Sequence, residues 1–361
     1  MRVLIAPDKF AGTLSAVEAA QAIATGWHRQ APGDELDLAP MSDGGPGFVD
    51  VLHEALGGEL LAVTVTGPFG TLVPATVLVA DGAAYVESAQ ACGIHLTGGE
   101  GAEFATTEGV GQLVAAALGT GVGTVVVGLG GSGTNDGGAG LLAGLGATAD
   151  GSLDTGAIGL ETVSAVDLGP ARQRLGDVRI IAATDVDSPL TGLFGATKTF
   201  GPQKGIPEER LPVVDGWLEG FAEVTDRRVS LEKGAGAAGG LGFALLLLGG
   251  SREPGIELVA SAVRLGERAR TADLVITGEG AFDFSSRSGK VPYGVAAVAA
   301  EVLRPCVAIA GQVLVGSREM RALGVESAYA VVDLAGEERA FGDPAGALAD
   351  AAARVARTWS R

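Results

Sequence analysis

Acidic and glycine-rich segments follow several apolar runs of the sequence, and they hold most of the side chains that could do chemistry. These segments are Asp8-Lys9, Ser42-Asp43, Gly131–Gly138, Asp185-Val186-Asp187 and Gly278–Asp283. A single aspartate after a strand is usually a turn residue, but five such segments in one chain are harder to explain in that way. Carboxylates beside bare backbone N–H groups suit a phosphate-bearing ligand that carries a divalent cation. We therefore expect these segments to line one cleft.

The few lysines of the chain support an anionic ligand. There are five lysines against 20 arginines, and all five lie in or beside glycine-containing segments. Lys204, in Gly-Pro-Gln-Lys-Gly, and Lys290, in Ser-Gly-Lys-Val-Pro, are the best placed to bind phosphate or carboxylate. A purely structural role in their loops is the alternative for both, and Lys198 and Lys233 are weaker candidates.

Buried strands and Ala-rich helices alternate along the chain and must position these groups. Continuous apolar runs occur at 3–7, 124–130, 179–184, 273–278 and 307–311. Such runs indicate parallel strands covered by helices on both faces. Helices are expected at 15–29, 108–118, 257–270 and 291–303, the first capped by Thr13 or Ser15. The alternation predicts an α/β fold, in which ligands bind at the carboxyl ends of the strands.

One region departs from this alternation. Residues 60–88 contain three candidate strands separated by Gly-Pro and Asp-Gly turns, which predicts an antiparallel meander. A chain of 361 residues has room for two domains. We therefore predict an inserted domain at 61–234, within a domain formed by 1–60 plus 235–361. Residues 149–176 are expected to be an irregular connection.

Charge and composition exclude several functional classes. The net charge of −18 leaves no basic surface for nucleic acid and disfavours anionic membranes. The leucine-rich run 243–248 is far too short to span a bilayer, and the first residues form a strand pattern, not a signal peptide. Cys92 and Cys306 have no metal or redox spacing and are expected to be buried thiols. These features predict a soluble, cytoplasmic protein that acts on a small molecule, as a monomer or homodimer.

Familiar nucleotide motifs are weak or absent. Two Gly-x-Gly-x-x-Gly matches begin at Gly128 and Gly234, but with 59 glycines in the chain such matches arise by chance. In an NAD-binding motif, an acidic residue at the end of a strand about 20 residues later binds the ribose. Neither match is followed by such a residue, which argues against NAD binding. The Gly289-Lys290 pair lacks the remaining residues of a Walker A motif. Any ATP must therefore be bound without a P-loop.

Longer motifs carry a resemblance that covers nearly the whole chain. They are Asp8–Leu14, Asp43-Gly44-Gly45, Gly128–Gly140, Asp185–Leu190, Phe200–Gly205, Gly234–Gly240, Ile276–Gly280 and Gly289–Pro292. Their content and order resemble those of type-1 glycerate kinases. The resemblance implies a Rossmann-like parallel-sheet domain with a second, inserted α/β domain. It also implies ATP-dependent phosphorylation of D-glycerate, typically to 2-phosphoglycerate in bacterial members.

Site roles follow from the requirements of phosphoryl transfer, which are positioning and charge neutralisation. Asp185 and Asp187 are expected to hold Mg²⁺, and Lys204 and Lys290 to neutralise charge on ATP or on the substrate carboxylate. Either Asp43 or Asp283 would orient the attacking hydroxyl or accept its proton. The residues expected to bind phosphate or substrate are Asp8, Lys9, Gly130, Gly131, Ser132, Asn135 and Gly280.

Several positions depart from the usual pattern of the resembled family. The residues concerned are Ala11 (usually lysine), Pro46 (glutamate), Ala281 (arginine), Ser285 (glutamine) and Ser288 (histidine). The changes remove two cations and one acid–base group, although Lys9 or Arg287 could compensate. They leave open a kinase for another small hydroxy acid, or a non-catalytic paralogue that binds a phosphorylated metabolite or nucleotide.

Overall fold

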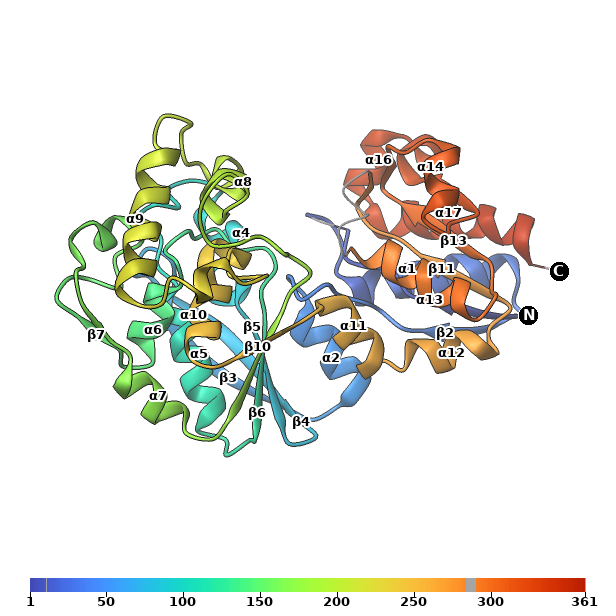
Figure 1. The fold of residues 1–361 in the computed structure, drawn as a ribbon. Helices are drawn as coiled ribbons and strands as arrows, with labels where there is room; N and C mark the ends of the chain where they lie inside the picture. Colours follow the sequence, from blue (N-terminus) through green and yellow to red (C-terminus); the bar gives the residue numbers. More distant parts are fainter. Residues whose placement is uncertain (11, 284–289, 361) are drawn as a thin grey trace. The chain divides into compact units, whose positions relative to one another are not determined.

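The computed structural model describes residues 1–10, 12–283 and 290–360, and the chain divides into two compact units (Figure 1). Unit 1 comprises Met1–Asp43, Asp50–Leu56 and Gly255–Arg361. Unit 2 comprises Gly44–Val49 and Gly57–Pro254. The fold is α/β in both units, and each unit has its own sheet.

Unit 1 is built on a five-stranded parallel sheet with the strand order β15-β13-β11-β1-β2. The strands are β1 (Arg2–Ile5), β2 (Glu35–Leu38), β11 (Leu274–Thr277), β13 (Cys306–Ala310) and β15 (Ser327–Ala330). All neighbouring strands pair in parallel, as the continuous apolar runs predicted. In this sheet β2 lies on one side of β1, and the later strands β11, β13 and β15 lie on the other side. The boundary between β1 and β11 is therefore a topological switch point, where open α/β sheets bind their ligands.

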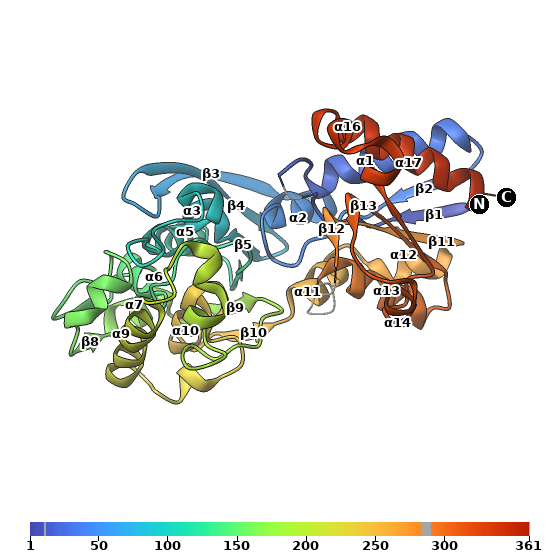
Figure 2. The same ribbon diagram turned by 90° about the horizontal axis from the view of Figure 1, so that it is seen from above.

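Helices cover both faces of this sheet. Figure 2 shows α1 (Ala16–Gln30) and α17 (Pro344–Trp359) together on one face, with α12 (Leu265–Thr271), α13 (Val291–Glu301) and α14 (Ser317–Ala322) on the other. The remaining helices of the unit are α11 (Gly255–Ala262), α15 (Val331–Ala335), α16 (Glu337–Gly342) and, from Asp50 onward, α2 (Phe48–Leu56). Ser15 caps α1 in a capping box with Glu18, which settles the choice between Thr13 and Ser15. Ile23 and Trp27 of α1 are fully buried in the core of the unit.

Unit 2 has a six-stranded mixed sheet with the order β10-β9-β6-β5-β4-β3. The strands are β3 (Glu59–Thr66), β4 (Leu72–Ala80), β5 (Ala83–Glu87), β6 (Thr124–Gly128), β9 (Arg179–Ala183) and β10 (Ser251–Glu253). The first three form the predicted antiparallel meander, and the others pair in parallel. Asp81 and Gly82 join β4 to β5 with positive φ angles of 51° and 76°, the conformation that a tight two-residue hairpin requires.

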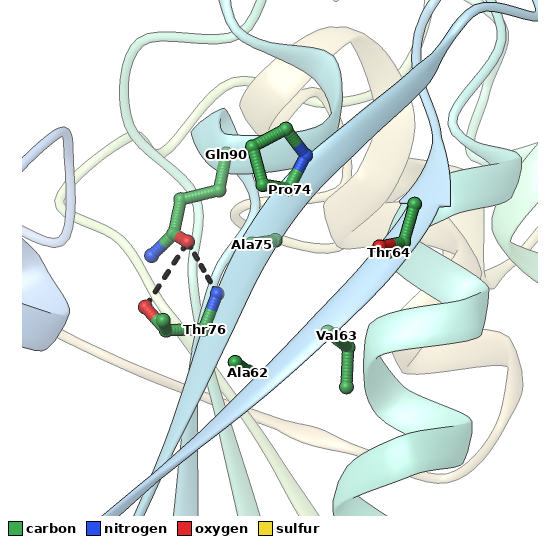
Figure 3. Close-up of a pocket in the computed structure, with 7 residues that line it drawn as sticks. All are labelled: Ala62, Val63, Thr64, Pro74, Ala75, Thr76 and Gln90. Atoms are coloured by element: carbon green, nitrogen blue, oxygen red, sulfur yellow. Dashed lines mark hydrogen bonds between the residues drawn. The ribbon is translucent and has the colours of Figure 1, made fainter.

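The β3–β4 hairpin extends past the end of β5, and a side chain replaces the missing strand there (Figure 3). Gln90 Oε1 accepts hydrogen bonds from the backbone N of Thr76 at 2.7 Å and from its Oγ1 at 3.2 Å. Pro74 lies in the same overhang, where its lack of an N–H costs no ladder hydrogen bond. The hollow in Figure 3 is lined by these residues and by small side chains of β3, so it carries no titratable group.

The helices of unit 2 enclose a large apolar core, of which Leu113, Leu141 and Phe243 are fully buried members. They are α3 (Ala89–Cys92), α4 (Ile94–Thr97), α5 (Glu108–Leu118), α6 (Ala139–Gly144), α7 (Gly169–Leu175), α8 (Ala196–Phe200), α9 (Leu211–Val224) and α10 (Leu241–Leu247). The connection 149–176 holds only short elements, among them β8 (Val166–Asp167), which pairs with β7 (Thr148–Ala149). Within the described ranges no helix is long and apolar enough to cross a membrane.

Two sequence-based expectations differ from the structure. The helix expected at 257–270 is two helices, because Arg264 adopts a left-handed conformation (φ 55°) that ends the first one. The expected inserted domain ends at 234, whereas unit 2 continues to Pro254. The additional residues belong to unit 2 because β10 extends its sheet beside β9 and α10 packs into its core.

Candidate active site

The switch point of unit 1 brings two acidic strand exits together. Asp8 follows β1 and Glu279 follows β11, and the backbone N of Asp8 donates to the carbonyl of Gly278 at 2.8 Å. Gly278 is required there, because a Cβ would lie 2.1 Å from the carbonyl oxygen of Ile309. Asp8 and Glu279 are each only 6% exposed. Ligands commonly bind at such a point, and here it carries buried carboxylates.

Lys9 holds the acidic residues of this cluster in place. Its Nζ lies 3.5 Å from Asp8 Oδ1 and 3.7 Å from Asp43 Oδ1. Burial raises the pKa of the Asp8 carboxyl from 3.8 to about 7, opposed by Lys9 and reinforced by Asp43 and Glu279. A carboxyl group with a pKa near neutrality can accept a proton from a substrate and release it again. Asp8 was predicted from the sequence as a site residue, but its raised pKa was not.

A second ion-pair cluster lies at the start of α13. Lys290 precedes the helix, and its Nζ lies 3.7 Å from Glu279 Oε2 and 3.6 Å from Asp283 Oδ1. Gly280 lies between Glu279 and Asp283 in the chain, so its expected role in binding phosphate or substrate stays a prediction. Glu279 is the residue that sequence reasoning left out. The sequence does contain the pattern that would have predicted it, since Glu279 follows a buried apolar run and stands between two glycines.

The loop after β6 in unit 2 is packed more closely than expected. A Cβ at Gly130 would lie 2.4 Å from the Cα of Gly45, and Gly131 (φ 73°) lies against the ring of Pro46. The backbone N of Gly130 already donates to the carbonyl of Gly44 at 3.0 Å. Gly131 is exposed and Gly130 half-buried, whereas residues 132–138 are buried. The glycines therefore allow close backbone packing. Because the N–H of Gly130 is already used, Gly131 is the exposed phosphate-binding candidate in this loop.

Lys204 lies inside unit 2, where it braces this loop. It is 3% exposed, and its Nζ donates to Ser132 Oγ at 2.9 Å and to the carbonyl oxygen of Thr134 at 2.8 Å. Burial lowers the pKa of the Lys204 ammonium from 10.5 to about 8, while Cys92 and Asp136 oppose the shift. Lys204 was expected to neutralise charge on a ligand. Its burial and its two hydrogen bonds within the loop contradict that expectation.

Two further residues of the loop are internal. Ser132 accepts the hydrogen bond of Lys204, and Asn135 Nδ2 donates to Thr197 Oγ1 at 2.9 Å. Asn135 is fully buried and Ser132 is 7% exposed. Direct hydrogen bonds from these side chains to a phosphate do not fit that burial, so we correct the expectation and assign both to positioning the loop.

Asp136 joins this loop to α5 and α6. Its Oδ2 accepts from Thr107 N at 2.8 Å, from Thr107 Oγ1 at 2.7 Å and from Gly140 N at 3.2 Å, and its Oδ1 accepts from Gly138 N at 3.0 Å. Burial nevertheless raises the pKa of the Asp136 carboxyl, because its desolvation outweighs the four hydrogen bonds. Asp136 is a structural anchor of the loop.

The two aspartates expected to hold Mg²⁺ have different surroundings. Both carboxylate oxygens of Asp187 face cations, with Arg252 at 2.7 Å and Lys233 at 3.4 Å, so Asp187 does not fit as a metal ligand in this arrangement. Asp185 stands two residues after the end of the short strand β9 and is half-buried. Within the described part of the chain, no group of three or more His, Cys, Asp or Glu side chains could hold a metal ion. Mg²⁺ often takes only one or two protein carboxylates together with substrate phosphates, so Asp185 fits that smaller role.

The positions that depart from the resembled family are only partly described. Ala11, Ser285 and Ser288 lie outside the described residues. Ala281 pairs with Gln312 in the short parallel ladder between β12 (Ala281–Phe282) and β14 (Gln312–Val313).

The comparisons with known proteins agree on one family. A model of the glycerate kinase family matches residues 3–360. The chain is 39% identical to the glycerate kinase of Bacillus subtilis, covering 92% of this chain and 90% of that protein. It is also 39% identical to the glycerate 2-kinase of Escherichia coli, over 92% and 91% of the two chains. The crystal structure of a candidate glycerate kinase 2 from Salmonella typhimurium LT2 superposes with a TM-score of 0.81 at 36% identity, covering 99% of this chain and 98% of that one.

Proposed function

Because the chain belongs to the glycerate kinase family, we propose that it catalyses the ATP-dependent phosphorylation of D-glycerate to 2-phosphoglycerate. The observation that carries the chemical part of this proposal is Asp8. It lies at the switch point of unit 1, beside Lys9, and its pKa is raised to about 7. A hydroxyl nucleophile needs a nearby group that accepts its proton during transfer.

In the proposed reaction, the substrate hydroxyl oxygen forms a bond to the γ-phosphorus of ATP while the bond from that phosphorus to the bridging oxygen breaks. ADP leaves with the electron pair of the broken bond, and the hydroxyl proton moves to a carboxylate oxygen of Asp8. This places the proton acceptor at Asp8 rather than at Asp43 or Asp283, the two expected from sequence. Asp43 then orients Lys9, with which it forms an ion pair.

The two lysines of unit 1 supply the charge that an anionic substrate and phosphate require. We assign Lys9 to the carboxylate of D-glycerate and Lys290 to the transferred phosphoryl group, with the latter oriented by Glu279 and Asp283. Ammonium groups bind such anions with charge-assisted hydrogen bonds. The backbone N–H of Gly280 in unit 1, and that of the exposed Gly131 in unit 2, would donate to phosphate oxygens. Gly130 is left out of this role because its N–H already donates to Gly44.

Mg²⁺ would arrive with ATP and neutralise charge on its phosphates. Asp185 is the residue that we propose to hold it. Asp187 is left out of this role because Arg252 and Lys233 already neutralise it.

The substitution Asp8→Asn tests the assignment of the base. We expect kcat to fall by about 10²–10⁴-fold, the usual contribution of general base catalysis. The wild-type rate should rise as the pH increases through about 7, because the base acts when deprotonated, and the variant should lose this dependence. Asp50→Asn, at an exposed position of α2, is the matched control and should leave kcat unchanged.

A stability measurement separates the loss of a base from misfolding. The folded-state pKa of Asp8 is above its unfolded value, so the stability associated with its protonated form is lost as the pH rises through about 7. Asp8→Asn should therefore unfold at a higher temperature than the wild type at pH 8. A stable variant that keeps wild-type kcat would remove Asp8 from the proton-accepting role.

A further inference from the structure

Unit 1 contains an apolar pocket that the proposed chemistry does not use. Its volume is about 220 Å³, and Phe10, Ala281, Gln312, Val332 and Phe341 are among the residues that line it. None of the described residues lining the pocket carries a charge. Ligand pockets are mostly apolar with a few polar groups that fix orientation, and this pocket has that composition.

The pocket lies beside the switch point. Phe10 follows Asp8 and Lys9 after β1, Gly280 follows Glu279 after β11, and Gly311 follows β13, so the pocket begins where three neighbouring strands end. These strand ends approach each other closely, since a Cβ at Gly311 would lie 2.4 Å from the carbonyl oxygen of Gly280. The other wall comes from the helical segments α15 to α17.

From this placement we infer that the pocket binds the purine base of the nucleotide, with its phosphates at the lysine clusters beside it. The inference deepens the proposed function and rests on it. A base is flat, aromatic and uncharged, whereas the phosphates are anionic. The chain places an uncharged pocket next in sequence to Lys9 on one strand exit and to the Glu279–Lys290 pair on another.

Two aromatic side chains and one amide suit a base. Phe10 is 5% exposed and forms part of the buried wall, whereas Phe341 is 59% exposed. Exposed aromatic rings at a pocket are suited to stacking on a planar ligand. Gln312, fixed by its ladder pairing with Ala281, offers both a donor and an acceptor to the polar edge of a purine.

The pocket volume also limits the ligand. Sites that enclose a whole drug-sized molecule have volumes of about 300–1,000 Å³, and this pocket is smaller. It can take one ring system, while the sugar and phosphates remain outside it. A glycerate molecule, with a carboxylate and hydroxyls on three carbons, has no apolar part to place there.

The test compares the binding of ADP with that of inorganic pyrophosphate by calorimetry. Ala340→Trp fills the pocket from α16, and Gln312→Ala removes the amide while leaving the pocket open. We expect Ala340→Trp to raise the Kd for ADP by about tenfold or more, because over-packing excludes the base. Gln312→Ala should raise it by about three- to tenfold. Neither variant should change pyrophosphate binding, and Ala345→Trp, exposed on α17 outside this pocket, is the control.

Three results would overturn the inference. ADP binding that neither pocket variant weakens would overturn it and leave the proposed function intact. A higher KM for the hydroxy acid, with an unchanged KM for ATP, would assign the pocket to the acceptor substrate. Failure of the wild type to bind ADP at all would overturn the proposed function and this inference together.

Discussion

Replacing Lys204 by methionine should change how the stability of the protein depends on pH. Methionine keeps much of the length of the side chain and removes its charge and its hydrogen bonds to Ser132 and Thr134. At pH 7 the substitution has two opposing effects on the free energy of unfolding. The two charge-assisted bonds are lost, each worth about 1.5–3 kcal/mol, but the protein no longer buries an ammonium group. We therefore expect the variant to remain within about 2 kcal/mol of the wild type at pH 7.

The difference between the two proteins should grow above pH 8. The folded-state pKa of Lys204, about 8, lies below its ordinary value of 10.5, so folding favours the neutral amine. Stability contributed by this group therefore rises between these two pH values. A shift of this size corresponds to roughly 3 kcal/mol. Lys204→Met has no amine to deprotonate and cannot gain this stabilisation. Its free energy of unfolding should therefore fall below that of the wild type by roughly 3 kcal/mol as the pH approaches 10.

Thermal unfolding at pH 7, 8, 9 and 10 measures the effect. A loss of roughly 3 kcal/mol corresponds to about 6–12 °C for a domain of about 150–250 residues. The gap in Tm between wild type and Lys204→Met should widen by that much from pH 7 to pH 10. Lys233→Met, at an exposed surface position, is the control and should show a constant gap. A gap that stays constant for Lys204→Met as well would refute the assignment of a depressed pKa to Lys204.

Three further predictions concern the loop and the metal. Asp136→Asn removes an acceptor for buried N–H groups and should lower stability by about 2–5 kcal/mol, measured by thermal unfolding; an unchanged Tm would contradict the anchoring role. Gly130→Ala should destabilise by about 1–3 kcal/mol, because its Cβ would overlap Gly45, whereas Gly216→Ala, at an exposed position of helix α9, should stabilise by about 0.5–1 kcal/mol. Equal Tm values for these two variants would contradict the packing argument. Asp185→Asn should reduce Mg²⁺-dependent turnover far more than Asp187→Asn, and the reverse order would place the metal at Asp187.

Five of the parallel strands could be predicted from the sequence, because burial on two faces leaves continuous apolar runs, whereas the short strands β10 and β15 were not among those runs. The parallel strands at Val3, Val125, Ile180, Val275 and Val307 lie where those runs predicted them. The antiparallel meander was also predictable, because an Asp-Gly pair between two apolar runs is a strong signal for a tight hairpin turn. Asp81 and Gly82 form that turn. The break at Arg264 was not predictable, because it depends on one residue adopting positive φ inside a helical pattern.

The residue types of the candidate site could also be predicted, but not their burial. Lys204 and Lys290 both lie beside glycines in the sequence, yet one is enclosed in unit 2 and the other forms ion pairs at the start of a helix. The raised pKa of Asp8 depends on burial and on Asp43 and Glu279, which are far from it in the chain. Such shifts arise from tertiary packing, which local patterns do not encode.

The measurement that tests the central claim most directly is ADP release by the purified protein with Mg²⁺ and ATP over a panel of hydroxy acids, with the phosphorylated product identified by NMR. We predict that D-glycerate supports ADP release, that one phosphoglycerate forms for each ADP, and that the phosphate is on the 2-hydroxyl. Turnover of a different hydroxy acid in preference to D-glycerate would contradict the substrate assignment. Binding of ATP without phosphorylation of any hydroxy acid would contradict the kinase account itself.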